Sequence, residues 1–145
     1  MKKLIFLTVP LLFACDQAEP IIEEPETKEI EKISWPYIFD KEDMEYLVYF
    51  YSEECGYCRS IKDEVLEYYA STTYKMYFLD LLENEDVVIK HGSGTPVGLN
   101  SVEDLFILGT PSLMKIEDKT VSEYYAGVQA IHDFISGVEE DNFSY

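Results

Sequence analysis

Two cysteines, Cys55 and Cys58, are separated by Gly56 and Tyr57, and this spacing allows a small reversible disulfide. The pair follows the apolar run 46–51 and opens a segment with helical periodicity. A cysteine at a helix N-terminus meets free backbone N–H groups and the positive end of the helix dipole, and both favour the thiolate. Because the thiolate is the form that attacks disulfides, the pair is a candidate for thiol–disulfide exchange.

The same pair allows two other interpretations. Zinc could use Cys55 and Cys58 with His91 and His132, but these histidines lie in a glycine-rich loop and in a terminal helical pattern, without the compact spacing of zinc modules. We therefore predict no metal here. A fixed structural disulfide is the stronger rival, although a loop this short gives less entropic stabilisation than a long-range bridge.

The first fourteen residues have the pattern of an export signal. Lys2 and Lys3 form a positive start, the apolar run 4–13 follows, and a small residue precedes Cys15. The run is shorter than the roughly 20 apolar residues that span a bilayer. The four residues ending at Cys15 also resemble the lipobox of bacterial lipoproteins, in which the cysteine is lipidated and begins the mature chain. An ordinary cleaved signal peptide is the alternative.

The cysteine count agrees with a lipidated Cys15. The chain has three cysteines, so a pair formed by Cys55 and Cys58 leaves one over, and lipidation accounts for it. We therefore expect the mature protein to be lipid-anchored at the extracytoplasmic face of a bacterial membrane. Such surroundings are oxidising, and disulfide chemistry is useful there.

The charge of the chain is strongly acidic, with 11 basic and 29 acidic side chains and a net charge of −18. Removal of residues 1–14 takes away two lysines and no acid, which leaves 9 basic and 29 acidic side chains and a net charge of −20. Nucleic acids and anionic lipids select basic patches. We therefore exclude nucleic acid as a partner and assign membrane attachment to the lipid on Cys15 alone.

Composition divides the mature chain into a linker and one domain. Residues 15–33 hold the cysteine and an acidic, proline-containing stretch with scattered apolar side chains, which predicts a disordered tether. Residues 34–145 are sufficient for a single domain with one core, and we expect it to be a monomer.

Hydrophobic periodicity in this domain predicts alternating strands and helices. We expect a short helical segment at 35–39 capped by Ser34, a buried strand at 46–51, an amphipathic helix of about 15 residues from the cysteines, a strand at 75–82, a short helix at 103–106 capped by Ser101, a hairpin of 112–116 and 121–125, and a terminal helix after Gly127. This order predicts an α/β fold with a central mixed β-sheet flanked by helices.

The arrangement resembles the thioredoxin superfamily. The resemblance is carried by the strand ending at 50–52, the motif 55–58 at a helix start, the segment 109–113 before the hairpin, and Gly127 before the last helix. It implies a thioredoxin-like fold over about residues 34–137. It also implies that Pro111 is a cis-proline across from the redox pair, and that Thr110 presents backbone groups to an extended substrate peptide.

The resemblance further implies a mechanism. Cys55 would be the nucleophile that forms a mixed disulfide with a substrate, and Cys58 would resolve it, with Tyr57 placed to stack on the substrate. No cofactor is implied beyond the Cys55–Cys58 disulfide itself. The expected partners are exported proteins bearing thiols or disulfides and a membrane redox partner, with the direction of electron flow open. The alternative is a lipid-anchored binding or accessory domain whose disulfide is structural.

Several positions depart from the family pattern. Many thioredoxins and protein disulfide isomerases carry a buried acid six residues before the first cysteine, where this chain has Tyr49. Glu54 replaces the usual tryptophan before that cysteine, and Glu53 stands beside it. Two carboxylates near Cys55 would disfavour its thiolate, and Arg59 would partly compensate. The alternative is that the two acids only solvate the loop.

The middle of the motif points to a subgroup. Gly56 and Tyr57, together with Thr110, resemble the active site of bacterial disulfide isomerases of the DsbC type. The compact single domain more closely resembles small thioredoxin-like lipoproteins of bacteria. We therefore predict a membrane-tethered thiol–disulfide oxidoreductase working as a reductase or an oxidase.

Overall fold

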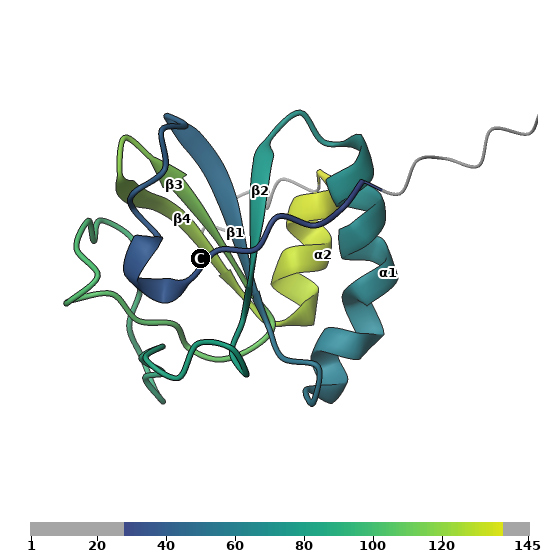
Figure 1. The fold of residues 1–145 in the computed structure, drawn as a ribbon. Helices are drawn as coiled ribbons and strands as arrows, with labels where there is room; N and C mark the ends of the chain where they lie inside the picture. Colours follow the sequence, from purple (N-terminus) through teal and green to yellow (C-terminus); the bar gives the residue numbers. More distant parts are fainter. Residues whose placement is uncertain (1–27, 138–145) are drawn as a thin grey trace, which may run out of the picture.

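Strand β1 (Glu45–Tyr51) lies inside a four-stranded sheet with the order β2-β1-β3-β4, seen in a computed structural model that describes residues 28–137 (Figure 1). It runs parallel to β2 (Lys75–Asp80) and antiparallel to β3 (Ser112–Glu117), which turns into β4 (Thr120–Ala126). The predicted mixed sheet is confirmed. Residues 1–14, Cys15 and most of the predicted tether lie outside the described residues.

Burial explains the apolar sequence of β1. Tyr46 to Phe50 are all buried, because both faces of the sheet are covered at this strand. Tyr46, Val48 and Phe50 face one core cluster, and the side chains between them face the other. A run of five apolar residues in one strand therefore supplies two cores.

Two helices cover one face of the sheet (Figure 1). Helix α1 (Gly56–Ser71) has the predicted length, and Ile61, Val65 and Tyr69 are its buried face. Helix α2 (Val128–Ser136) begins after Gly127 and buries Ile131. No helix within residues 28–137 is long and apolar enough to cross a membrane.

Irregular chain covers the other face. The short 3-10 helix η1 (Trp35–Tyr37) and the segment 99–107 pack there, with Trp35, Ile38, Leu105 and Ile107 buried. The predicted helix at 103–106 is wrong: residues 102–104 form a turn, and Leu105 and Ile107 then run extended along the core. Three consecutive buried residues, 105–107, cannot share one face of a helix, which is why the chain is extended here.

The predicted Ser34 cap is also wrong. Ser34 precedes η1 but makes no side-chain cap hydrogen bond. The N–H of Trp35 instead donates to Asn84 Oδ1 at 2.9 Å, so a residue from the long loop after β2 satisfies the start of η1. Similarly, Ser101 Oγ donates to the Glu103 carboxylate rather than capping a helix.

The hairpin of β3 and β4 is confirmed. Strand β3 extends one residue past its predicted end, and β4 extends one residue beyond its predicted bounds at each end. Its turn places Asp118 and Lys119 at φ 49° and 60°, the paired positive values that a tight two-residue hairpin requires. Strand β2 ends at Asp80, two residues before the predicted end, because Asp80 Oδ1 accepts a hydrogen bond from the N–H of Leu82 and turns the chain.

The domain begins earlier than the predicted boundary at residue 34. Phe78 of β2 donates its N–H to Glu31 O at 2.8 Å, and Ile33 donates its N–H to Phe78 O at 2.9 Å. Ile33 is buried in the core. The end of the predicted tether thus pairs with the outer edge of β2, which would otherwise expose unpaired backbone groups.

Candidate active site

Cys55 occupies the N-cap of α1, directly after the loop that leaves β1. Its backbone is extended (φ −79°, ψ 116°), and its N–H donates to Ser52 O at 3.1 Å. Its Sγ accepts a hydrogen bond from the N–H of Cys58 at 3.3 Å. The predicted position of Cys55 at a helix N-terminus is confirmed, and the sulfur takes the place of a capping oxygen.

The two thiols differ in exposure. Cys55 is half-buried, whereas Cys58, one turn into α1, is only 5% exposed, and both are free thiols in the structure. A substrate disulfide can therefore reach Cys55 more readily than Cys58. This asymmetry suits a nucleophile paired with a resolving cysteine.

Hydrogen bonding separates the pKa values of the two thiols. Burial alone raises the pKa of Cys55, but hydrogen bonding to the Cys58 thiol, to the Thr110 side chain and to backbone N–H groups outweighs burial and lowers it. For Cys58, burial is the largest cause, and the hydrogen bond with Cys55 adds to it, which raises the pKa of Cys58 to about 11. Cys55 is therefore the thiol that ionises first.

Thr110 and Pro111 come from the segment before β3 and close the other side of the site. The Cys55 thiol donates to Thr110 O at 3.5 Å, and the Thr110–Pro111 peptide bond is cis, the form that the resemblance implied. Ser112 fixes the same turn by donating its hydroxyl to Gly109 O at 2.6 Å. The fold thus brings together residues that lie 55 positions apart in the chain.

The remaining predicted site residues surround this pair. Tyr57 is 73% exposed at the first turn of α1, where it can meet a partner. Arg59 donates from Nη1 to the backbone carbonyl of Glu53 at 2.9 Å and so ties α1 to the loop. A Cβ at Gly56 would lie in ordinary contact with Arg59, 3.7 Å from its Nη2. Glu54 is exposed, and its N–H donates a hydrogen bond to Ser52 Oγ at 3.3 Å.

A cavity of about 100 Å³ opens behind Cys58, between α1, β1 and β2. Tyr49, Cys58 and Phe78 are among its walls, and Arg59 and Lys62 are among its charged lining residues. The sequence identified Tyr49 only as the position of a missing acid. Nothing in the sequence indicated that Phe78 and Lys62 line this cavity, because their place in its wall depends on how α1 crosses the sheet.

The two histidines that a zinc site would need have other surroundings. His132 on α2 pairs through Nδ1 with Glu64 Oε1 on α1 at 2.6 Å, and His91 is exposed in its loop. Within residues 28–137, no three His, Cys, Asp or Glu side chains gather in a group that could hold a metal ion.

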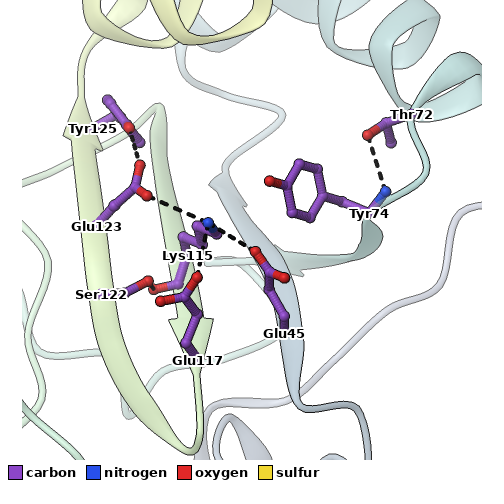
Figure 2. A network of polar contacts seen from close by, with 8 residues as sticks. All are labelled: Glu45, Thr72, Tyr74, Lys115, Glu117, Ser122, Glu123 and Tyr125. Atoms are coloured by element: carbon purple, nitrogen blue, oxygen red, sulfur yellow. Dashed lines mark hydrogen bonds and ion pairs between the residues drawn. The ribbon is translucent and has the colours of Figure 1, made fainter.

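A second polar centre lies near the start of β1, at the opposite end of the sheet from the cysteines (Figure 2). Lys115 Nζ lies 2.8 Å from Glu45, 2.9 Å from Glu117 and 3.4 Å from Glu123. The lysine side chain is largely buried, whereas the three carboxylates remain partly exposed to water. Tyr125 donates to Glu123 in the same network. Its donors and acceptors satisfy one another, so we interpret it as structural.

Comparisons with known proteins agree with the fold. Solved structures similar to this chain include the thioredoxin of Malassezia sympodialis (TM-score 0.53, 14% identity, 75% of this chain and 90% of that chain) and mitochondrial thioredoxin 3 of Saccharomyces cerevisiae in its oxidized form (TM-score 0.52, 15% identity, 75% and 95%). Thioredoxin f of spinach chloroplast is similar too (TM-score 0.52, 15% identity, 74% and 88%).

No protein-family model and no curated protein matches the sequence. The structural similarity spans most of each thioredoxin, and the adjacent cysteines fit the C-x-x-C pattern. The chain therefore has the α/β thioredoxin-like fold that its sequence predicts.

Proposed function

We propose that this chain is a protein thiol–disulfide oxidoreductase that uses Cys55 as nucleophile and Cys58 as resolving thiol. The observation that carries the proposal is the setting of Cys55. Its sulfur caps α1, its pKa is lowered by hydrogen bonding, and it lies beside Thr110 and the cis-proline. A cysteine that only stabilised the fold would need neither the exposure nor the lowered pKa.

The reaction follows from this arrangement. The Cys55 thiolate attacks one sulfur of a substrate disulfide, forming a mixed disulfide and releasing the other substrate sulfur as a thiolate that takes up a proton from solvent. Cys58 then loses its proton and attacks Cys55 Sγ. The Cys55–Cys58 disulfide forms, the second substrate thiolate leaves, and the substrate has gained two electrons and two protons. The reverse sequence oxidises a dithiol.

The substrate peptide is proposed to lie along Thr110 and Pro111. Thr110 O already accepts a hydrogen bond from the Cys55 thiol, so this backbone borders the reacting sulfur. An extended peptide could pair with it as an added strand, and exposed Tyr57, two residues after Cys55, offers an aromatic surface.

The location and partners are proposed on the sequence alone. The lipobox-like segment ending at Cys15 supports a lipid anchor at the extracytoplasmic face of a bacterial membrane, with exported proteins as clients. The cysteine pair itself serves as the redox group. A redox partner is needed to recycle the pair, because each turnover leaves it in the opposite oxidation state, and we propose that this partner is a membrane protein.

A trapping experiment tests the proposal. Cys58→Ser removes the resolving thiol, so mixed disulfides between Cys55 and client proteins should accumulate and disappear on treatment with a reductant. Cys55→Ser is the matched control and should trap none. Both variants carry Cys15→Ser, so that Cys15 cannot form mixed disulfides of its own. Absence of complexes, with a Cys55–Cys58 potential below about −300 mV, would establish the structural-disulfide alternative instead.

The pH dependence of alkylation checks the order of ionisation. Cys55 should react with iodoacetamide along a curve whose midpoint lies below that of an ordinary cysteine, because hydrogen bonding lowers its pKa. Cys58 should gain reactivity only at much higher pH, near its pKa of about 11. Peptide mass spectrometry separates the two sites. Simultaneous titration of both thiols would contradict the assignment of their roles.

The direction of electron flow is a separate measurement. A reduction potential near that of thioredoxin, about −270 mV, combined with insulin reduction, would identify a reductase. A potential near about −120 mV, that of a strongly oxidising dithiol protein, would identify an oxidase.

A further inference from the structure

Tyr49 carries the buried side-chain oxygen that has no hydrogen-bond partner within residues 28–137; every other buried side-chain oxygen or nitrogen in that range is paired. The residue is 4% exposed. A buried unpaired hydroxyl costs about 1–3 kcal/mol, and phenylalanine would fill the same space without that cost. The hydroxyl therefore calls for an explanation in another state of the protein.

The ring of Tyr49 is held in place. It stacks on Tyr51, with ring centroids 5.9 Å apart and planes 8° apart, and it meets Phe78 edge to face at 5.8 Å. Both strands that carry these rings are paired in the sheet. The hydroxyl thus cannot readily turn to solvent for a partner, and any partner must come to it.

The groups facing Tyr49 narrow the choice of partner. Helix α1 contributes Cys58, Arg59 and Lys62 to the cavity that Tyr49 lines, the preceding loop contributes Glu53, β1 contributes Tyr51, and β2 contributes the apolar Phe78. Arg59 and Lys62 are cations that cannot accept a hydrogen bond. Of the two reacting thiols, Cys58 is the one that lines this cavity, and its sulfur becomes a stronger acceptor when it ionises.

The electrostatics agree. Burial is the main cause that raises the pKa of the Tyr49 hydroxyl, and the charges of the Cys58 and Cys55 thiolates are the next causes, in that order. The hydroxyl therefore stays protonated throughout the physiological range, so it can donate a hydrogen bond and cannot act as a base. Because charge coupling is reciprocal, a proton kept on Tyr49 favours a thiolate on Cys58.

We infer that the Tyr49 hydroxyl is the hydrogen-bond donor that stabilises the Cys58 thiolate as it resolves the mixed disulfide. The inference rests on the proposed function. In this step the Cys58 proton leaves to solvent, the Cys58 sulfur bonds to Cys55 Sγ, and the substrate sulfur departs as a thiolate that takes a proton from solvent. Tyr49 transfers no proton. Where many thioredoxins have a buried acid that accepts a proton, this chain has a neutral hydroxyl that donates a hydrogen bond. That hydroxyl finds its partner only when Cys58 is ionised.

A titration tests the inference directly. In the full chain carrying Cys15→Ser and Cys55→Ser, Cys58 is the remaining cysteine, and NMR of isotopically labelled cysteine β-carbons follows its ionisation. Tyr49→Phe removes the hydroxyl and keeps the ring. A hydrogen bond to a charged group is worth about 1.5–3 kcal/mol, so the pKa of Cys58 should rise by about 1–2 units. Tyr46→Phe, a second buried tyrosine of β1, is the matched control and should leave it unchanged.

Substrate release is the second readout, measured on chains that retain both active-site cysteines. A rise of 1–2 units reduces the thiolate fraction of Cys58, and the greater nucleophilicity of the more basic sulfur offsets part of the loss, so release from the mixed disulfide should slow about three- to tenfold. The first step, measured with Tyr49→Phe in the Cys58→Ser background, should keep its rate.

The two readouts separate the inference from the proposed function. If Cys58→Ser traps no substrate, the proposed oxidoreductase function fails, and the titration alone still decides whether Tyr49 stabilises the Cys58 thiolate. If trapping succeeds but Tyr49→Phe changes neither the Cys58 titration nor the release rate, the role assigned to Tyr49 is overturned and the proposed function stands.

Discussion

Both faces of the sheet bury aromatic side chains, but the two faces differ in how the buried hydroxyl groups are hydrogen-bonded. On the loop-covered face, Tyr46 donates its hydroxyl to Ile38 O at 2.6 Å, and Tyr124 accepts from the N–H of Leu108 at 2.8 Å. On the helix-covered face, near the cysteines, Tyr49 has no partner and a cavity adjoins it. On the first face these tyrosine hydroxyls are hydrogen-bonded, as is usual in a structural core. On the second face the Tyr49 hydroxyl lacks a partner, at the place where we propose that the chemistry occurs.

This contrast teaches more than either face alone, because one strand builds both. Tyr46 and Tyr49 are buried tyrosines three residues apart on β1, so they point to opposite sides of the sheet. Their environments, and not their residue type, decide whether the hydroxyl is a structural or a functional group. Four pairs of substitutions can break or sharpen this comparison.

The largest effect is expected from truncation of aromatic core residues. Phe50→Ala on the loop-covered face should lower the free energy of unfolding by about 3–5 kcal/mol, since it leaves a sealed void. Phe78→Ala should cost less, because its ring borders a cavity that already exists and that water can enter. Chemical denaturation measures both. Equal losses of unfolding free energy in the two variants, or a larger loss for Phe78→Ala, would contradict the difference in packing between the faces.

A smaller loss is expected from the Lys115 network on the helix-covered side of the sheet. Lys115→Met leaves three carboxylates near one another, and the free energy of unfolding should fall by about 2 kcal/mol at pH 7, less than for a fully buried pair since the carboxylates are partly exposed. Glu117→Gln is the charge control and should cost less than the lysine change.

The sign of the pH dependence of that loss follows from the pKa shifts. Burial lowers the pKa of Lys115, but the hydrogen bonds that its ammonium donates to Glu45 and Glu117 outweigh burial and raise it. Its contribution to stability therefore persists below its ordinary pKa and is lost as pH rises through the raised value. A hydrogen bond from Lys115 lowers the pKa of Glu117, whose contribution is lost as pH falls through that lowered value. The stability difference between Lys115→Met and the wild type should thus shrink in acid, and a constant difference would contradict the network.

The two tyrosines should respond to the same substitution with opposite signs. Tyr46→Phe removes a hydrogen bond and leaves Ile38 O unpaired, so the free energy of unfolding should fall by about 1 kcal/mol. Tyr49→Phe removes an unpaired hydroxyl and should leave the dithiol form unchanged or more stable by up to about 1 kcal/mol. Thermal unfolding under reducing conditions measures both, and an equal loss in the two variants would mean that Tyr49 is also satisfied.

The smallest effect is expected at the start of η1. A functioning N-cap loses about 0.5–2 kcal/mol on replacement by alanine, but Ser34 makes no cap hydrogen bond, so Ser34→Ala should change the free energy of unfolding by less than that range. Asn84→Ala is the matched control, because Asn84 Oδ1 holds the Trp35 N–H and its loss should be measurable. Greater sensitivity at Ser34 than at Asn84 would reverse this assignment.

Much of the fold was predictable because its signals are local. The apolar run of β1, the periodicity of α1 and the turn of the β3–β4 hairpin depend on neighbouring residues, and the structure confirms all three. The failures are at 103–106 and at Ser34. In both places a contact from distant chain, the core packing of Leu105 and Ile107 or the amide of Asn84, replaces the local preference.

The candidate site divides in the same way. The sequence by itself determined that Cys55 opens a helix, that Cys58 follows one turn later, and that Thr110 and Pro111 precede a strand, since residue type and spacing suffice for those statements. Only the tertiary structure decided that Cys55 lies against Thr110, that Cys58 is the buried thiol, and that Tyr49 faces the cavity behind it unpaired. Burial and hydrogen bonding are properties of the packed chain, and they set which thiol ionises first and what meets the charge when the second one does.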